Sequence, residues 1–197
     1  MKVIGLTGGI GSGKSTVLNY LLDNCNCVLI LSDFVGANLR RKGEINYKKI
    51  VELFGSSILD ENEEISTSKL REITFNDPEK LRQLEEISWG NIYDYIKEEI
   101  QVFIELDCFD YIILESALMF ESGLDKLCDE IWFISVEKEE RIKRIMANRN
   151  YTRKMCETVI KKQMKEDEFK ERCQKIIDNS GDIKKLYKQI DEILKES

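Results

Sequence analysis

A glycine-rich segment near the start of the chain constrains the fold more than any other feature. Residues 8–15 read Gly-Gly-Ile-Gly-Ser-Gly-Lys-Ser and match the pattern G-x-x-x-x-G-K-[ST]. The apolar run Lys2–Thr7 precedes this segment, and apolar side chains recur at helical spacing after it, over Lys14–Leu22. A strand, a tight loop and a helix in this order predict an α/β fold that opens with a buried strand.

This segment, the P-loop, has the chemistry of a phosphate site. Glycines let backbone N–H groups turn inward around phosphate oxygens, and the start of the following helix adds a positive dipole end. In this pattern Lys14 reaches the β- and γ-phosphates, and the Ser15 hydroxyl is a ligand of Mg²⁺. We therefore expect ATP and Mg²⁺ as cofactors, against the alternatives of a turn that binds nothing or a P-loop that binds without turnover. The expected nucleotide-binding residues are Gly9, Ile10, Gly11, Ser12, Gly13, Lys14, Ser15 and Thr16.

Short apolar runs recur along the chain between helical patterns, the last of which runs to about Glu196. This alternation predicts a three-layer αβα fold with a mostly parallel five-stranded sheet, covered by helices on both faces. The predicted strands are Lys2–Thr7, Cys27–Leu31, Tyr111–Leu114, Ile131–Val136 and a short run at Ile176-Ile177.

The stretch between the second and third predicted strands is charged, poor in glycine and too long for a simple crossover. It contains helical patterns at Tyr47–Phe54 and Thr67–Phe75, and a longer one that starts at Asp77-Pro78, where Asp caps the helix and Pro occupies the first turn. We expect one domain over 1–197, with a core at about 1–40 and 107–197. A helical insertion on the substrate side occupies about 41–106.

Composition narrows the class of protein. The 197 residues are 42% hydrophobic and 34% charged, which favours a globular chain, and the net charge of −7 argues against nucleic-acid or membrane partners. No signal peptide or membrane span is apparent, so we expect a cytoplasmic protein that is a monomer or a small homo-oligomer. The absence of histidine excludes His-dependent triads and His metal sites. The six scattered cysteines favour reduced, buried thiols over a metal or redox role.

A P-loop alone does not separate kinases from GTPases or motor ATPases, so other side chains must decide. Phosphoryl transfer to a hydroxyl needs acids, which belong at the carboxyl ends of the strands. Asp33 follows the second strand and is a candidate general base, or alternatively the N-cap of a helix over Phe34–Arg41. Glu115 ends the third strand and is a candidate Mg²⁺ ligand through water, or alternatively a surface carboxylate.

A basic stretch follows the fourth strand, over residues 137–153. In small P-loop kinases such a stretch forms a lid that closes over ATP and excludes water, which places a lid here at about 144–170. Because arginine suits bidentate phosphate contact, Arg144, Arg149 and Arg153 are candidates as a group, while a solvated helix face is the alternative.

Several segments carry a likeness that extends beyond the P-loop. The chain opens with Leu-Thr-Gly-Gly-Ile-Gly at residues 6–11, Leu118–Leu124 reads Leu-Met-Phe-Glu-Ser-Gly-Leu, and Ile177–Gly181 reads Ile-Asp-Asn-Ser-Gly. With Leu70–Pro78, Leu84–Ile87 and Gln163, these segments resemble the dephospho-coenzyme A (dephospho-CoA) kinases over nearly the whole chain.

The resemblance implies a kinase with a nucleotide-binding core, a helical coenzyme-binding insertion and a lid. Such a kinase transfers the γ-phosphate of ATP to the ribose 3′-hydroxyl of the small-molecule substrate dephospho-CoA, the last step of coenzyme A biosynthesis. The resemblance makes Asp33 the base and places Asn179 near the adenine. It also makes Arg149 the catalytic lid arginine, one residue after the position expected for it, which is Asn148.

The departures from the family pattern lie mostly on the acceptor side. Leu31 stands where the family has the first Asp of Asp-x-Asp, and Trp89-Gly90 stands where it has His-Pro. These changes keep two alternatives open, a P-loop kinase for another small metabolite and a catalytically weak regulatory homologue that binds a nucleotide or coenzyme A.

Overall fold

The computed structural model describes residues 1–75, 77–149 and 151–196. The chain forms two compact units, the first made of residues 1–29 and 106–197 and the second of residues 30–105. The expected insertion contains Asn76 and the expected lid contains Asn150, and both residues lie outside the described ones. The insertion and the lid, as parts of one kinase domain, stay predictions.

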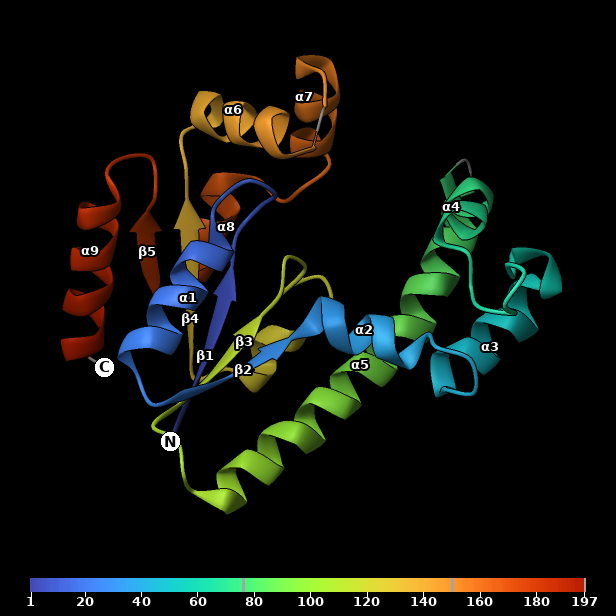
Figure 1. The fold of residues 1–197 in the computed structure, drawn as a ribbon, viewed down its shortest axis with the longest axis horizontal. Coiled ribbons are helices and arrows are strands. Elements are labelled where there is room, and N and C mark those ends of the chain that lie inside the picture. Colours follow the sequence, from blue (N-terminus) through green and yellow to red (C-terminus); the bar gives the residue numbers. More distant parts are fainter. Residues whose placement is uncertain (76, 150, 197) are drawn as a thin grey trace. The chain divides into compact units, whose positions relative to one another are not determined.

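The sheet has the strand order β2-β3-β1-β4-β5. Strand β1 runs parallel to both β3 and β4, and β4 runs parallel to β5 (Figure 1). The central strands β1, β3 and β4 are almost continuously apolar, as expected for strands buried on both faces. The predicted five-stranded, mostly parallel sheet is confirmed. The strands are β1 (Lys2–Thr7), β2 (Cys27–Leu31), β3 (Tyr111–Glu115), β4 (Glu130–Ser135) and β5 (Lys175–Asp178).

Two helices, α1 (Lys14–Asn24) and α9 (Ile183–Glu196), pack on one face of this sheet. Their apolar side chains recur three and four residues apart, which puts them on one side of each helix. The rings of Tyr20 and Tyr187 stack with centroids 4.1 Å apart and join the two helices. The buried helix residues of this layer are Val17, Leu18, Leu21, Leu186 and Ile190.

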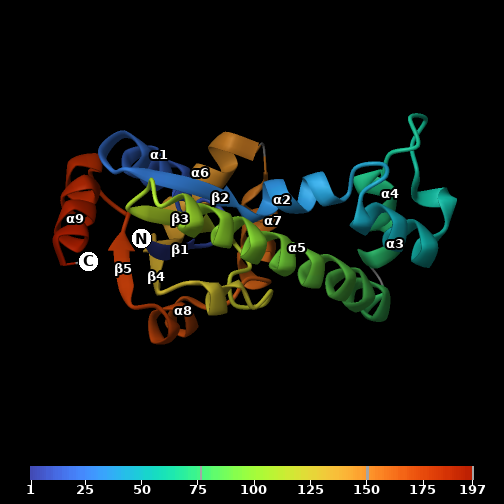
Figure 2. The ribbon, with the colours of Figure 1, turned by 90° about the horizontal axis from the view of Figure 1, so that it is seen from below.

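The other face is covered by α8 (Glu166–Arg172) and the short helix η2 (Leu124–Leu127). Phe169 of α8 stacks on Phe133 of β4, with ring centroids 4.6 Å apart. Figure 2 shows α1 and α8 on opposite sides of the strands, which confirms the three layers. The sheet therefore carries a filled apolar layer on both faces.

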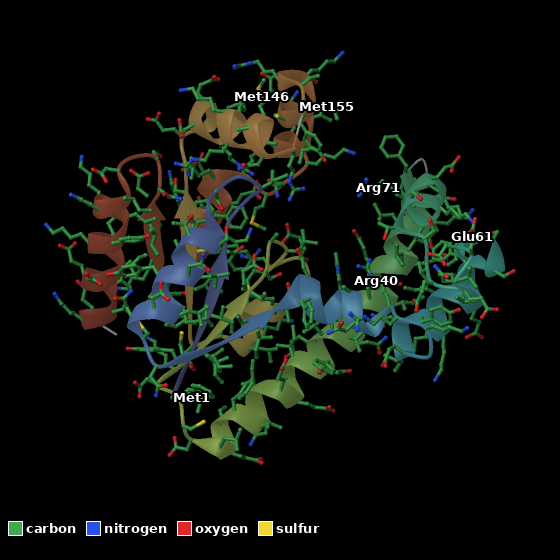
Figure 3. All side chains as sticks on the ribbon, viewed as in Figure 1. Met1, Arg40, Glu61, Arg71, Met146 and Met155 are labelled. Atoms are coloured by element: carbon green, nitrogen blue, oxygen red, sulfur yellow. The ribbon has the colours of Figure 1, made fainter. Side chains whose placement is uncertain are left out.

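Two further helices, α6 (Lys138–Arg149) and α7 (Arg153–Lys161), follow β4. Ile142, Ile145 and Cys156 are buried between them, and Ile10 of the P-loop packs against this cluster. Met146 of α6 and Met155 of α7 have exposed side chains (Figure 3). Packing on Ile10 ties this helix pair to the P-loop.

The second unit is helical and has its own small core, in which Ile50, Ile58 and Leu70 are buried. The predicted start of its long helix is confirmed, because the Lys80 N–H donates to Asp77 Oδ1 at 3.0 Å and Pro78 opens the helix. Among the described residues, no helix has the length and apolar composition of a membrane span. The helices are α2 (Ser32–Leu39), α3 (Ile45–Phe54), η1 (Ser56–Ile58), α4 (Thr67–Phe75) and α5 (Pro78–Leu106).

Candidate active site

The P-loop connects β1 to α1, as predicted, and its last glycine adopts a conformation that other residues avoid. Gly13 precedes α1 with φ 89°, in the left-handed region. A Cβ at this position would lie 2.2 Å from Nδ2 of Asn179, so the backbone and the amide approach too closely for any side chain. The buried Asn179 side chain donates to the Ser12 carbonyl at 2.8 Å. Asn179 thus supports the P-loop directly.

Lys14 and Glu115 meet beside the carboxyl ends of β1 and β3, inside the sheet order. The Lys14 ammonium donates to the Gly8 carbonyl at 2.8 Å and lies 3.3 Å from Glu115 Oε1. The parallel register, which pairs Leu6 with Glu115, sets this carboxylate level with the start of the P-loop. Only 12% of the Glu115 side chain is exposed, so the alternative of a surface carboxylate is wrong.

The oxygen atoms near Lys14 suit Mg²⁺. Within residues 1–75, 77–149 and 151–196 no group of three or more Asp, Glu, Cys or His side chains gathers as a preformed metal cage. Mg²⁺ keeps several waters and is bound by one or two protein oxygens together with substrate phosphates. The exposed Ser15 hydroxyl and the Glu115 carboxylate are hard donors of this kind, so the residues present fit the ion.

Arg141 of α6 is a P-loop contact that the sequence prediction missed. Its Nε donates to the Ile10 carbonyl at 2.6 Å, and its Nη2 donates to Gln163 Oε1. The same Gln163 oxygen accepts from the Ile10 N–H at 3.2 Å. A Cβ on Gly9 would lie 1.8 Å from Arg141 Nη2, so this glycine makes room for the guanidinium group.

Burial shapes the electrostatics of this contact. Removal from water lowers the pKa of Arg141 below its ordinary value, while the charge of Glu166 acts in the opposite direction. The P-loop therefore has a largely desolvated cation on one side, in addition to Lys14. The only sequence signal for it is the arginine-rich run of α6, which does not single out Arg141.

The three arginines predicted as a group have separate environments. Arg144 donates to the Asn179 carbonyl at 2.9 Å and pairs with Glu140, so it contacts the residue that supports the P-loop. Arg153 is exposed and ion-paired with Glu139 and Glu157. Arg149 ends α6 with an exposed side chain that has no ion pair within the described part of the chain. A phosphate role for Arg149 stays a prediction.

Asp33 belongs to the second unit. The helix that was expected to start at Phe34 starts instead at Ser32, because β2 leads directly into α2 at Leu31. Asp33 therefore lies in the first helical turn, and Leu31 before the helix makes no side-chain cap hydrogen bond. The N-cap alternative for Asp33 is wrong. Its carboxylate is exposed and accessible to a substrate.

All six cysteines are free thiols, and the expectation that they are buried is wrong for Cys108. Cys156 is buried, whereas Cys108 is exposed. Burial raises the pKa of Cys27 to about 11, and of Cys128 and Cys173 to about 12. These three thiols are therefore protonated at neutral pH.

Comparison with known proteins places the chain in one family. The family model described as dephospho-CoA kinase matches residues 2–185. The chain is 35% identical to the dephospho-CoA kinase of Carboxydothermus hydrogenoformans over 196 residues, which cover 100% of this chain and 94% of the relative. It is 38% identical to that of Aquifex aeolicus over 200 residues, with coverage of 100% and 97%.

A solved structure shares the fold. The dephospho-CoA kinase from Campylobacter jejuni superposes with a TM-score of 0.73 at 23% identity, covering 98% of this chain and 96% of that one. Both the family model and the two relatives extend far beyond the P-loop, into α5, α6 and β5. The chain belongs to the dephospho-CoA kinase family.

Proposed function

We propose that this protein is a dephospho-CoA kinase, which transfers the γ-phosphoryl group of ATP to the ribose 3′-hydroxyl of dephospho-CoA and releases coenzyme A and ADP. The observation that carries this proposal is the buried pairing of Lys14 with Glu115 beside the P-loop. A cation and a carboxylate held together beside the P-loop, with side chains that are 16% and 12% exposed, are groups that phosphoryl transfer from a Mg²⁺-bound nucleotide uses.

The P-loop residues bind and orient the triphosphate in this proposal. Backbone N–H groups of residues 9–16 turn toward the phosphates, and the Lys14 ammonium moves from the Gly8 carbonyl to the β- and γ-phosphates. Ser15 and Glu115 would hold Mg²⁺, which when bound neutralises charge on the phosphate oxygens. Asn179 keeps the P-loop in shape through Ser12 and, as the family likeness implies, lies beside the adenine.

Asp33 is the proposed general base. Its exposed carboxylate accepts the proton of the 3′-hydroxyl as the new phosphorus–oxygen bond forms and the bond from phosphorus to the ADP oxygen breaks. Arg149 is the proposed lid arginine, whose exposed guanidinium stabilises the charge of the transferring phosphoryl group. The segment 144–170 then acts as the lid, and 41–106 as the coenzyme-binding insertion.

The free thiols fit a reducing compartment, and we propose that the protein acts in the cytoplasm. A small-molecule acceptor needs no second chain, so a monomer or a small homo-oligomer remains our expectation. The net charge of −7 argues against a nucleic-acid partner.

The assay that tests the function follows ADP release with ATP, Mg²⁺ and one acceptor at a time. We expect one ADP per coenzyme A with dephospho-CoA, and at least a hundredfold loss of rate in Lys14→Ala and in Asp33→Asn. A matched control is Lys143→Ala, which removes an exposed lysine of α6 and leaves the rate unchanged. ADP release that does not depend on dephospho-CoA would contradict the proposal.

A second candidate, a kinase for another small metabolite, is favoured by the side chains around α2 and α5. Leu31, in place of an expected acid, is 37% exposed just before Asp33, and Trp89 is half-buried in α5. The same assay with a panel of small hydroxyl compounds decides, since a faster reaction with any of them than with dephospho-CoA selects this candidate. Nucleotide or coenzyme A binding without turnover would select the regulatory homologue instead.

A further inference from the structure

A cavity in the second unit has a positively charged lining that the phosphoryl-transfer chemistry does not use. It encloses about 170 Å³ between the end of α2 and the start of α4. Arg40 and Arg41 directly follow the last residue of α2, and Figure 3 shows the position of Arg40 there. Ile65 and Leu70 supply apolar walls. The other lining residues are Ala37, Glu64 and Thr67.

The two guanidinium groups are available to a ligand. Within the part of the chain that the structure describes, neither Arg40 nor Arg41 uses its side chain in an ion pair or hydrogen bond. The one acid in the lining, Glu64, is engaged by the backbone N–H of Lys42 at 3.0 Å. By contrast, Arg82 of the same unit pairs with both Glu79 and Glu86. Two arginines in one cavity that form no ion pair with any described residue, Glu64 included, favour an anionic ligand.

The start of α4 adds to this preference. Thr67 is the first residue of α4 and lines the cavity, so the positive end of a nine-residue helix borders the same space as the guanidinium groups. Planar guanidinium forks, a hydroxyl and helix N–H groups together suit a phosphate ester better than a single carboxylate, because a phosphate offers more acceptor oxygens.

The helix α2 links this cavity to the proposed base. Asp33, Ala37 and Arg40 are spaced i, i+4 and i+7, and Arg40 keeps right-handed helical angles at φ −91° and ψ −4°. Residues at this spacing share one face of a helix, and seven residues span about 10 Å along its axis. A substrate held with its hydroxyl at Asp33 therefore extends a second group toward Arg40 along the same helix face.

We propose that the cavity lined by Arg40, Arg41 and Thr67 binds the diphosphate group of the acceptor. In dephospho-CoA the diphosphate is attached to the 5′ carbon of the same ribose that carries the reacting 3′-hydroxyl, so the two groups lie within the reach of two helical turns. This assignment rests on the proposed function, and it makes the cavity a specificity site. It selects nucleotide-like acceptors that carry a diphosphate over smaller hydroxyl compounds.

The test compares the two substrates of the same enzyme. Arg40→Met and Arg41→Met keep the aliphatic stem and remove the charge. We expect each to lower kcat/KM for dephospho-CoA by about tenfold, and the double variant by about a hundredfold. The KM for ATP should stay unchanged, a split that general loss of folding would not produce. Arg40→Lys and Arg41→Lys should recover part of the loss because the ammonium keeps the charge.

A matched control is Arg82→Met, which removes an arginine of the same unit whose charge is already paired and leaves both kinetic constants unchanged. An unchanged kcat/KM for dephospho-CoA in the double variant, with thermal unfolding like the wild type, would overturn the inference.

Calorimetric titration of dephospho-CoA separates this inference from the proposed function. If the wild type binds dephospho-CoA but transfers no phosphate, the proposed function fails, and weaker binding by the double variant still supports the cavity. If wild type and double variant bind it equally, or neither binds it, the cavity is not its site.

Discussion

The guanidinium group of Arg141 occupies the space that any side chain at residue 9 would need. Gly9→Ala should therefore push Arg141 off the Ile10 carbonyl and produce the same defect as Arg141→Met. We expect each variant to weaken ATP binding about tenfold and to lower the free energy of unfolding by about 1–3 kcal/mol, since a charged hydrogen bond is lost. Calorimetric titration with ATP and urea unfolding measure the two effects.

The double variant supplies the sharper result. Because both changes break the same contact, the double variant should lose much less ATP-binding free energy than the two single variants lose together. Full additivity would show that Gly9 and Arg141 act independently. Lys143→Ala, on the exposed side of α6, serves as the control and should bind ATP like the wild type.

These residues also show where sequence reasoning reaches its limit. Lys14, Ser15 and Glu115 could be predicted because their roles follow from position, at the P-loop or at a strand end. Arg141 could not be predicted, because its contact with Ile10 depends on how α6 packs, and α6 has several arginines with the same local signal. The roles proposed for Asp33 and Arg149 rest on the family likeness.

At the scale of elements, the long helix α5 contains a glycine that lowers its stability. Gly90 lies inside Pro78–Leu106, and a Cβ built there meets no atom within 4 Å. Gly90→Ala should therefore raise the free energy of unfolding by about 0.5–1 kcal/mol, because alanine loses less backbone entropy on forming a helix. Thermal or urea unfolding measures the gain.

Gly36 of α2 is the matched control, since its Cβ would approach Ile92 Cδ1 at 3.1 Å. Gly36→Ala should gain nothing or lose stability. Equal stabilisation by both substitutions would contradict the claim that packing separates these two helical glycines.

Elements were the part of the fold that the sequence predicted best. Strands β1 and β2 and helix α4 have the predicted bounds, because apolar runs and helical spacing are local signals. The predicted start of α2 was wrong, because a serine and an aspartate that follow a strand resemble the N-cap of a helix. In the folded chain the strand passes into the helix without one.

At the scale of the whole molecule, the ion pair of Lys2 with Glu130 joins the starts of β1 and β4. Burial raises the pKa of Glu130, but hydrogen bonds from Lys2 and Trp132 outweigh it and hold the pKa below its ordinary value. The carboxylate therefore stabilises the fold above the pKa of the unfolded chain, and this contribution is lost as the pH falls through the folded-state pKa.

Glu130→Gln should lower the free energy of unfolding by about 1 kcal/mol near neutral pH. The difference from the wild type should shrink in acid, where the wild-type carboxyl group is protonated too. Urea unfolding at about pH 7 and about pH 3 measures both values. A difference that grows in acid would contradict the sign of the shift.

The family as a whole was recognisable from the sequence because its segments extend from the P-loop to the last strand. The acceptor-binding residues were harder to recognise, because Leu31 and Trp89-Gly90 depart from the family pattern. We propose that the chain nevertheless transfers phosphate to the ribose 3′-hydroxyl of dephospho-CoA.

The position of the transferred phosphate is the most direct test of that claim. Purified protein is incubated with ATP, Mg²⁺ and dephospho-CoA, and the product is examined by phosphorus NMR and mass spectrometry, with Lys14→Ala in parallel. We expect a new monoester at the ribose 3′ oxygen, formed by the wild type and absent with the variant. Unchanged dephospho-CoA, from protein that binds ATP, would contradict it.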